Sequence, residues 1–272
     1  MMRIRISILS QCIEIYDDND FFYRRYSIST AKNGAGEQRG SFRTPRGRHL
    51  IRAKIGAGQP ENAVFVGRRP TGEIWTPELA AAHPGRDWIL TRILWLSGRE
   101  PGVNRLGDVD TMRRYIYLHG SPDTVEMGSP GSIGCVRMRN RDIIELFNLV
   151  PPYTPVDIVE FRVDGAQTET GAPTASAYGP AGEPLGSGHL RVDGCIDGLA
   201  VLEPWRGKGV GTALLDRLQE SAAERSMGQV WLDVPRARTE FFQRLGFRQQ
   251  GEAFLDSGIP CLRMIRQLPS VS

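Results

Sequence analysis

The feature that most limits how this chain can fold is a stretch of small and polar residues beyond its midpoint. Residues 164–188 are mainly Gly, Pro, Ala, Ser and Thr, and only Tyr178 and Leu185 offer large apolar side chains. A segment that buries so little apolar surface cannot offset the entropy that it loses on ordering. The composition therefore predicts a flexible linker over residues 164–184 that divides the chain in two.

Length and composition agree with two folded domains, which we place at residues 1–163 and 185–272. The chain has 272 residues, and one domain takes roughly 150. Hydrophobic residues make up 40% of the chain and charged residues 24%, a globular composition rather than a disordered one. The net charge of +3 is too small to indicate nucleic acid or an anionic membrane, so we expect a small substrate. The oligomeric state stays open.

Targeting and metal-binding patterns are not found in the sequence. No run approaches the roughly 18 apolar residues that a transmembrane segment needs. The first fifteen residues carry Arg3, Arg5 and Glu14 and have no signal-peptide core, which predicts a cytoplasmic protein. The cysteines are too far apart for a CxxC zinc site or a disulfide framework, so we expect no metal. They are Cys12, Cys135, Cys195 and Cys261.

The first domain has the period of β-strands. Ile4, Ile6 and Ile8 alternate with polar residues, as in a half-buried strand. One helix is predicted over residues 141–149, with Asn140 as its N-cap. We therefore expect a β-rich domain with a few helices.

The second domain has an α/β rhythm, in which strands alternate with helices. Its expected elements are a strand at 198–202, a basic glycine-rich turn at 205–211, an amphipathic helix at 210–225, a strand at 230–234, a helix at 239–245 and a strand from 247.

A histidine and a cysteine in the first domain could form a nucleophilic pair. His119 ends an alternating run, and fifteen residues separate it from Cys135, which directly follows Gly134. A thiol is a weak nucleophile until it is deprotonated, so a catalytic cysteine needs a base, which His119 could be. The N–H groups of Gly134 and Cys135 could hold a developing oxyanion. The alternative is a small buried cysteine and a strand-end histidine without a catalytic role.

The first domain resembles the L,D-transpeptidase (YkuD) catalytic domain across residues 3–162. Four motifs in the family's order carry this resemblance. They are Ser29-Thr30-Ala31-Lys32-Asn33, Thr44-Pro45-Arg46-Gly47, His119-Gly120 and Ser132-Ile133-Gly134-Cys135-Val136-Arg137-Met138. The chain departs from the family's pattern at Ile133, where a second histidine usually stands that is not the principal base.

The resemblance implies a β-sandwich-like fold and thioester chemistry on the peptide stems of bacterial peptidoglycan. In that reading Cys135 is the nucleophile, His119 moves its proton, and the Gly134 N–H helps to hold the oxyanion. The stem peptide loses its terminal D-alanine, and an amine or water then resolves the thioester.

The same resemblance suggests which residues bind the substrate. It places Arg137, Ser132 and Gly120 against the stem peptide, with the guanidinium group of Arg137 bound to a carboxylate. Arg137 could equally tie down its own turn through hydrogen bonds to carbonyl groups. We interpret the motif at 44–47 as a fold marker, and two further histidines as surface loop residues rather than ligands. They are His49 and His83.

A basic glycine loop precedes the main helix of the second domain. Backbone N–H groups and the helix dipole would converge there, which suits a pyrophosphate. The alternative is simply a tight basic turn, and neither a Walker loop nor a Rossmann fingerprint fits the spacing. The loop residues are Arg206, Gly207, Lys208, Gly209, Val210, Gly211 and Thr212.

The second domain resembles the GNAT N-acetyltransferases over residues 184–267, through this loop followed by Leu245-Gly246-Phe247. The resemblance implies that the loop binds acetyl-CoA and that pantetheine lies along a strand near Leu199 and Val201. We expect linker in place of the family's N-terminal strand and paired helices, which makes this a truncated GNAT domain.

Two positions of the second domain also depart from the GNAT pattern. Phe242 stands where the family often has a tyrosine acid, and it has no proton to give. Cys261 stands where relatives commonly carry histidine, and we expect it to be a small buried side chain.

The leading hypothesis is a bacterial acyltransferase of peptidoglycan synthesis, and so of cell-wall biogenesis and cell shape, with an appended acetyl-CoA-binding domain that could be a second transferase. The alternative is a GNAT acetyltransferase whose first half only binds murein peptides. A third reading is a CoA or peptide sensor without chemistry. We expect the cytoplasm, or the periplasm and cell envelope if mature peptidoglycan is the substrate.

Overall fold

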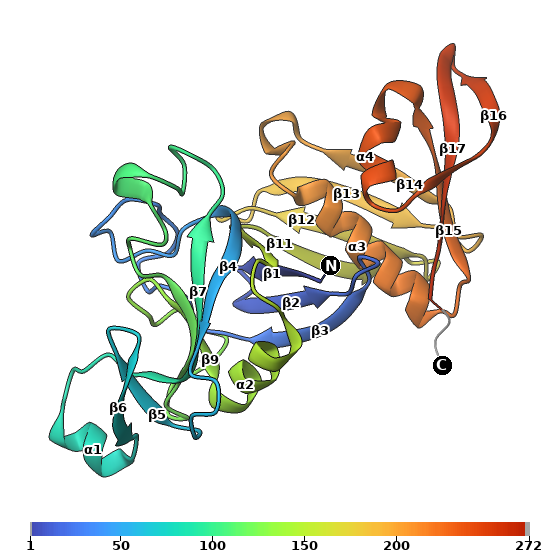
Figure 1. Cartoon of the computed structure of the whole chain (residues 1–272). Helices are drawn as coiled ribbons and strands as arrows, with labels where there is room; N and C mark the ends of the chain where they lie inside the picture. Colours follow the sequence, from blue (N-terminus) through green and yellow to red (C-terminus); the bar gives the residue numbers. More distant parts are fainter. Residues whose placement is uncertain (1, 270–272) are drawn as a thin grey trace. The chain divides into compact units, whose positions relative to one another are not determined.

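The computed structural model describes residues 2–269, in two compact units that are considered separately here (Figure 1). The first unit runs to Tyr16 and continues over Tyr23–Glu160. The second takes in Asp17–Phe22 and the chain from Phe161 onward. Two folded units were predicted, but the boundary falls at residue 160 or 161.

The first unit is built on one curled, mixed sheet. Its path is β3-β2-β1-β10-β4-β7-β5-β6, with β8 paired to β7 and β9 to β8. The strands are β1 (Arg3–Ser7), β2 (Cys12–Tyr16), β3 (Phe22–Ser27), β4 (Gly47–Ile55), β5 (Ala63–Val66), β6 (Arg69–Ile74), β7 (Ile89–Gly98), β8 (Tyr117–Ser121), β9 (Val136–Arg139) and β10 (Pro155–Val159). The β-rich prediction is confirmed.

The core of this unit follows from the alternation seen in the sequence. Ile4 and Ile6 are fully buried, and β1 pairs in parallel with β10 and antiparallel with β2. Two parallel partnerships, β1 with β10 and β8 with β9, need long connections. The second of these positions the site described below.

Helix α2 (Asn140–Leu149) packs on β7 and β8, close to its predicted range. Ile143 and Leu146 are fully buried on its inner face. The cap assignment was wrong: Arg139 is the N-cap residue, and the Asn140 amide instead bonds Thr91 and Asn62. The remaining helices of the unit are short, α1 (Pro77–Ala82) and the 3-10 turn η1 (Gly107–Val109).

The predicted linker was wrong, because residues 164–184 belong to a regular antiparallel sheet. Strands β11 (Arg162–Gln167), β12 (Pro173–Tyr178), β13 (Pro184–Leu190) and β14 (Ile196–Val201) pair in sequence order. Unit 2 therefore begins with a strand, although no helix lies between β11 and β14 in this fully described stretch.

Small residues occur in these strands because helix α3 (Val210–Glu224) lies directly on them. A Cβ atom at Gly165 would stand 2.4 Å from Arg217 Nε, and one at Gly188 would stand 3.0 Å from Leu218 Cδ1. Low bulk therefore permits close helix packing rather than flexibility.

The rest of unit 2 forms a three-stranded sheet, in the order β15-β17-β16. Its elements are η2 (Glu203–Trp205), β15 (Gln229–Pro235), η3 (Arg236–Arg238), α4 (Thr239–Arg244), β16 (Arg248–Asp256) and β17 (Ile259–Gln267). Cys195, directly before β14, forms an isolated bridge with Trp231 of β15, and β14 itself has no ladder with β15, so this edge of β14 is open.

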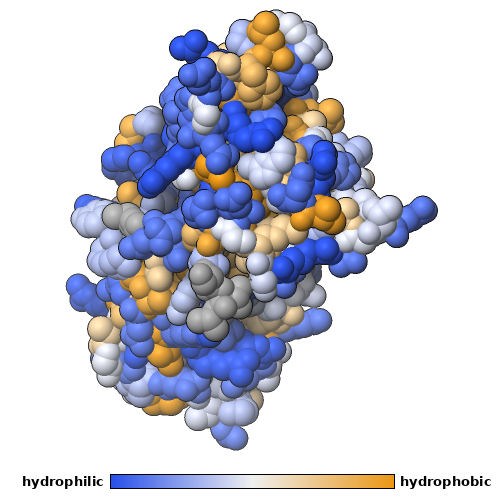
Figure 2. All heavy atoms as spheres, turned by 90° about the vertical axis from the view of Figure 1, so that its right-hand side faces the viewer, coloured by the Kyte–Doolittle hydropathy of each residue, from blue (hydrophilic) through white to orange (hydrophobic). Residues whose placement is uncertain are grey.

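The described helices include none that is long and apolar enough to cross a membrane. In the space-filling view, hydrophilic residues dominate, and one apolar group lies at the top where β16 turns into β17 (Figure 2). Leu255 and Ile259, at 73% and 52% exposure, belong to this turn region.

Candidate active site and cofactor loop

The register of β8 and β9 brings the predicted nucleophile and base to one face of the sheet. His119 pairs with Arg137, and Leu118 pairs with Val136. Side chains alternate along a strand, so Tyr117, His119, Cys135 and Arg137 share one face. The opposite face carries Leu118 and Val136 into the main core.

The Cys135 thiol lies between two backbone groups of the segment that leads into β8. The Tyr117 N–H donates to Sγ at 3.4 Å, and Sγ donates to the Tyr115 carbonyl oxygen at 3.4 Å. Loss of water contact raises the pKa of Cys135 to about 12, although Arg137 and Arg114 oppose the rise. At neutral pH the group is therefore a thiol and needs a base to become nucleophilic.

His119 has the tautomer that a base requires. Its Nδ1 donates to the Gly120 carbonyl oxygen at 2.7 Å, because a carbonyl can only accept. Its Nε2 is buried and has no hydrogen-bond partner among residues 2–269. Burial lowers the pKa of His119, and Asp87 opposes this shift. The ring is therefore neutral, with a free lone pair on Nε2.

The turn before Cys135 corrects the predicted oxyanion donor. Gly134 has φ +135°, a conformation open to glycine. Its N–H donates to Ser132 Oγ at 3.2 Å, and that hydroxyl donates to the Cys135 carbonyl oxygen at 2.5 Å. The Gly134 N–H is thus occupied. The Cys135 N–H, which bonds no acceptor in the described chain, is the remaining candidate.

Two predicted substrate contacts prove to be buried supports. Ser132 is 2% exposed and holds the turn just described. Gly120 is buried as well, and a Cβ there would lie 2.4 Å from Asn140 Oδ1 and 2.8 Å from the Leu90 carbonyl oxygen. Gly120 therefore permits close packing behind His119 instead of touching a substrate.

Arg137 is tied to its own surroundings, as the alternative interpretation held. Its guanidinium donates to Asp87 Oδ1 at 2.6 Å and to the Gly131 carbonyl oxygen at 3.1 Å. Both ends of the fork are engaged. In this structure the guanidinium therefore supports its own turn, and a contact of Arg137 with a substrate carboxylate stays a prediction.

Sequence reasoning missed the part played by Thr44. This hydroxyl is fully buried, accepts from the Ala31 N–H at 3.0 Å and donates to the Gly134 carbonyl oxygen at 3.0 Å. The motif at 44–47 is therefore more than a fold marker, since it anchors the cysteine turn. The sequence carried one signal of this role: the motif at 44–47 stands in the family's order with the other three motifs.

The two other histidines of this unit differ from each other. His83 is exposed, as predicted. His49 is not on a surface loop but 1% exposed in β4, with Nδ1 2.9 Å from the Gly47 carbonyl oxygen and Nε2 3.0 Å from Thr111 Oγ1. Burial lowers the pKa of His49 to about 4.

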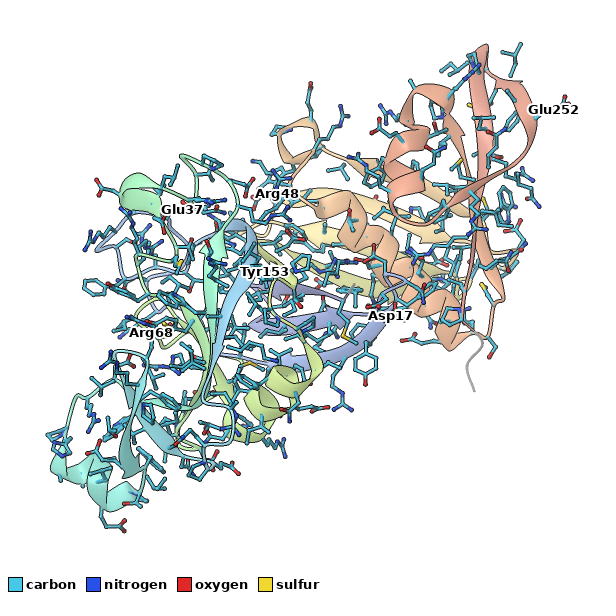
Figure 3. All side chains as sticks on the ribbon, in the orientation of Figure 1. Asp17, Glu37, Arg48, Arg68, Tyr153 and Glu252 are labelled. Carbon is cyan, nitrogen blue, oxygen red and sulfur yellow. The ribbon has the colours of Figure 1, made fainter. Side chains whose placement is uncertain are left out.

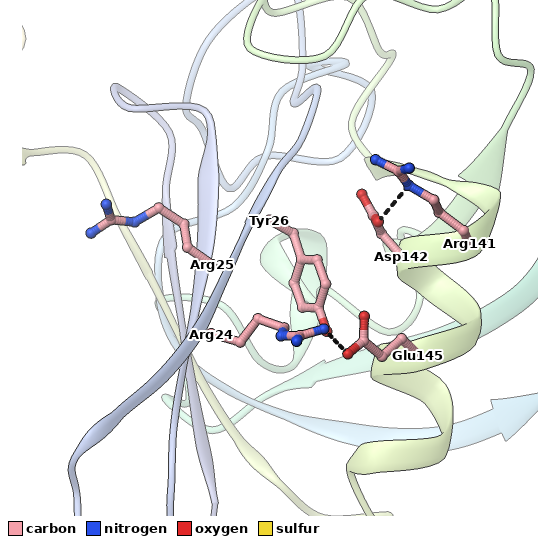
Figure 4. Close-up of a pocket in the computed structure, with 6 residues that line it drawn as sticks. All are labelled: Arg24, Arg25, Tyr26, Arg141, Asp142 and Glu145. Atoms are coloured by element: carbon pink, nitrogen blue, oxygen red, sulfur yellow. Dashed lines mark hydrogen bonds and ion pairs between the residues drawn. The ribbon is translucent and has the colours of Figure 1, made fainter. Parts of the chain in front are cut away.

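A surface hollow of about 340 Å³ lies between β3 and α2 (Figure 4) and holds none of the predicted site residues. Its guanidinium groups already face carboxylates: Arg24 pairs with Glu145, Arg25 with Glu14 and Arg141 with Asp142. The lining residues are Arg24, Arg25, Tyr26, Arg141, Asp142 and Glu145. The paired charges give no reason to assign it a ligand.

The glycine loop of unit 2 presents free backbone donors. Gly207 and Gly209 have φ +74° and +87°, and Gly209 caps α3 without a side-chain bond. The first N–H groups of α3, from Val210 on, have no partner inside the helix. Lys208 Nζ lies 4.9 Å from the centre of the Trp205 ring. This end of α3 is suited to an anion.

The predicted loop residues lie beside the open edge of β14. Arg206 Nε donates to the Val201 carbonyl oxygen at 3.2 Å. A Cβ at Gly211 would lie 3.7 Å from Val201 Cγ2, so the start of α3 touches this strand. Leu199 and Val201 are on the part of β14 that β15 leaves unpaired. An extended ligand with an anionic end fits this arrangement.

Two departures in unit 2 have a structural explanation. Phe242 is 6% exposed and packs edge-on against Phe241 and Phe247. Cys261 is 5% exposed in β17, as expected of a small buried side chain.

Family models match both units. The L,D-transpeptidase catalytic domain (YkuD) matches residues 2–158, and the acetyltransferase (GNAT) domain matches residues 162–268. Together they cover nearly all of the described chain.

Individual relatives match parts of the chain. The uncharacterized protein YyaT of Bacillus subtilis is 26% identical over 89 residues, which are 32% of this chain and 60% of that protein. The uncharacterized N-acetyltransferase YjcF of the same organism is 31% identical over 88 residues, 31% of this chain and 63% of that one. The chain thus spans about 60% of the length of these curated relatives.

Solved structures give matches for each unit. An L,D-transpeptidase from Mycobacterium smegmatis has 15% identity and a TM-score of 0.34, with 58% of each chain covered. A GNAT family acetyltransferase from Elizabethkingia anophelis with acetyl-CoA bound has 15% identity and a TM-score of 0.34, over 40% of this chain and 99% of that one.

Proposed function

The chain belongs to the L,D-transpeptidase (YkuD) family and continues into a GNAT acetyltransferase domain, and from this we propose that unit 1 transfers acyl groups of peptidoglycan stem peptides through Cys135. The observation that carries the proposal is the unpartnered His119 Nε2 on the same strand face as the thiol. A buried ring nitrogen without a partner is costly, so a free lone pair there suits a base.

The neutral pair sets the order of proton movements. As Sγ attacks the carbonyl carbon before the terminal D-alanine, the thiol proton passes to His119 Nε2 and the carbonyl oxygen becomes an oxyanion. We expect the Cys135 N–H to donate to that oxygen, since it bonds no acceptor among the described residues. When the C–N bond breaks, His119 returns the proton to the leaving amine and a thioester remains on Cys135. An incoming amine or water then repeats the sequence in reverse.

The test is acylation by a carbapenem, whose strained ring forms a thioester with an active cysteine of this family. We expect the wild-type mass to rise by one carbapenem, mapped to Cys135. Cys135→Ala should give no adduct, and His119→Gln should slow acylation about 100-fold or more because the base is lost.

Cys12→Ala is the matched control, since Cys12 is the other half-buried cysteine, and it should acylate at the wild-type rate. Folded wild-type protein without an adduct would favour the alternative, in which unit 1 binds murein peptides without chemistry.

For unit 2 we infer acetyl-CoA binding, with the pyrophosphate on the loop Arg206–Thr212 and the pantetheine along the open edge of β14. The free N–H groups at the start of α3 and the unpaired strand edge support this. Bound acetyl-CoA would supply an activated acetyl group. Phe242 has no proton to donate to a leaving thiolate, so any transfer must use another acid.

A further inference from the structure

Arg68 occupies a turn position that does not itself require an arginine. It follows Gly67 between β5 and β6, and the two residues have φ +68° and +55°. Two consecutive positive φ values are typical of a tight hairpin turn whose second position is usually Gly or Asn. A longer side chain is strained there, so the arginine is better explained by what its side chain does.

The side chain of Arg68, whose place is labelled in Figure 3, lies over two aromatic rings. Its guanidinium carbon lies 4.6 Å from the Trp95 ring centre and 4.9 Å from that of Tyr115, and Nη1 donates to the Tyr117 hydroxyl at 3.2 Å. We call Trp95, Tyr115 and Tyr117 the aromatic platform. The Trp95 ring centre lies 6.3 Å from that of Tyr115 and 6.0 Å from that of Tyr117. Stacking fixes the guanidinium in place before any ligand arrives.

The aromatic platform also holds the nucleophile. The Tyr115 carbonyl oxygen and the Tyr117 N–H are the two backbone groups that contact Cys135 Sγ. Tyr115 is 52% exposed, and Cys135 is half-buried. A ligand on the exposed part of the platform would therefore lie beside the reacting sulfur.

The charges distinguish Arg68 from the arginine that the sequence favoured. Arg137 is already paired with Asp87. Arg68 has no carboxylate partner among the described residues, and one hydrogen bond to Tyr117 leaves most of its five N–H donors unused. A positioned, unpaired guanidinium is the usual partner of a carboxylate, which it binds through two parallel hydrogen bonds.

We propose that Arg68, stacked on the aromatic platform, binds the free C-terminal carboxylate of the acyl-donor peptide. The peptide's identity rests on the proposed function, whereas the carboxylate subsite rests on the contacts of Arg68 alone. Arg68 is then a specificity-determining residue that selects stems ending in a free acid.

The test compares a stem tetrapeptide that ends in a carboxylate with the same peptide as a C-terminal amide. Both are titrated calorimetrically into the full-length Cys135→Ala protein, where no turnover occurs. We expect the acid to bind roughly tenfold more tightly, in keeping with a charged hydrogen bond. Adding Arg68→Gln should abolish that preference, and Arg68→Lys should restore only part of it because the planar fork is missing.

Arg69→Gln is the matched control, because Arg69 is the next residue along the same hairpin and is exposed. It should keep the acid preference. Equal affinities for acid and amide in the parent protein would overturn the inference, as would an unchanged preference in Arg68→Gln.

Two further readouts separate this inference from the proposed function. Arg68→Gln should leave the alkylation rate of Cys135 by uncharged iodoacetamide unchanged, and a large fall would mean that Arg68 only maintains the thiol's surroundings. An acid preference without any acylation of wild-type Cys135 would support the subsite and contradict the transpeptidase. Acylation of Cys135 together with an acid preference that Arg68→Gln leaves unchanged would support the transpeptidase and contradict the subsite.

Discussion

Thr44 shows how a single hydroxyl can set the geometry of a nucleophile 91 positions further along the chain. It bonds Gly134, directly before Cys135, across a sequence separation of 90 residues. Sequence reasoning proposed Cys135 and His119 as a pair through the family motifs that contain them, and the register of β8 and β9 brings both to one face of the sheet. It did not anticipate that Ser132 Oγ accepts from the Gly134 N–H or that Asp87 pairs with Arg137, because these contacts depend on how the turns fold.

Thr44→Val tests this anchoring role. The change keeps the side-chain shape, but it leaves the Ala31 N–H and the Gly134 carbonyl oxygen buried without a partner. We expect the free energy of unfolding in urea to fall by about 1–3 kcal/mol. Carbapenem acylation of Cys135 should slow as well, since the turn loses its support. Thr44→Ser retains the hydroxyl and should stay close to wild type, and wild-type acylation in Thr44→Val would contradict the role.

At the scale of elements, a strand with alternating large apolar residues was predictable and strands of small residues under a helix were not. The alternation of Ile4 and Ile6 identifies β1 without further information. β12 buries only Pro173, Ala175 and Ala177 at its alternating positions, and its small residues resemble a linker until α3 is placed over them. Helix α3, whose close packing explains these small residues, begins more than thirty residues after β12 ends.

The histidine buried in β4 makes stability depend on pH. The pKa of His49 falls from 6.5 to about 4 on folding, so the folded state holds the proton less tightly than the unfolded state. The resulting stabilisation is fully present above pH 6.5 and is lost as the pH falls towards 4. At 1.36 kcal/mol per pKa unit it amounts to about 3 kcal/mol.

Urea unfolding at pH 7 and pH 4 measures this effect. His49→Gln should remove about 3 kcal/mol of the wild-type decrease between the two pH values, and His83→Gln, which changes an exposed histidine, should remove none. The same pH dependence in His49→Gln and wild type would show that His49 is not the titrating group.

On the scale of the whole molecule, two candidate sites occupy two separate units. Cys135 lies in the unit that the transpeptidase model matches, and the loop at 206–212 lies in the unit that the acetyltransferase model matches. Each site draws its supporting contacts from its own unit: Thr44 and Ser132 on one side, Val201 and Trp205 on the other. Both chemistries should therefore respond independently to mutation.

Two single variants and their double variant test this independence. Lys208→Glu places a negative charge where a pyrophosphate would bind, so acetyl-CoA affinity in a calorimetric titration should fall about tenfold or more. Its carbapenem adduct on Cys135 should form at the wild-type rate. Cys135→Ala should lose the adduct and keep its acetyl-CoA affinity within about twofold, and the double variant should combine both losses without an extra effect, as sites that share no partners do.

Arg248→Glu is the charge-reversal control, since it changes an exposed arginine of β16 that is not part of the loop. It should leave acetyl-CoA binding unchanged. If the wild type binds no acetyl-CoA, the proposal that the loop binds this ligand is contradicted. If Lys208→Glu suppresses the Cys135 adduct, the two sites are coupled, and a shared regulatory role would replace two independent chemistries.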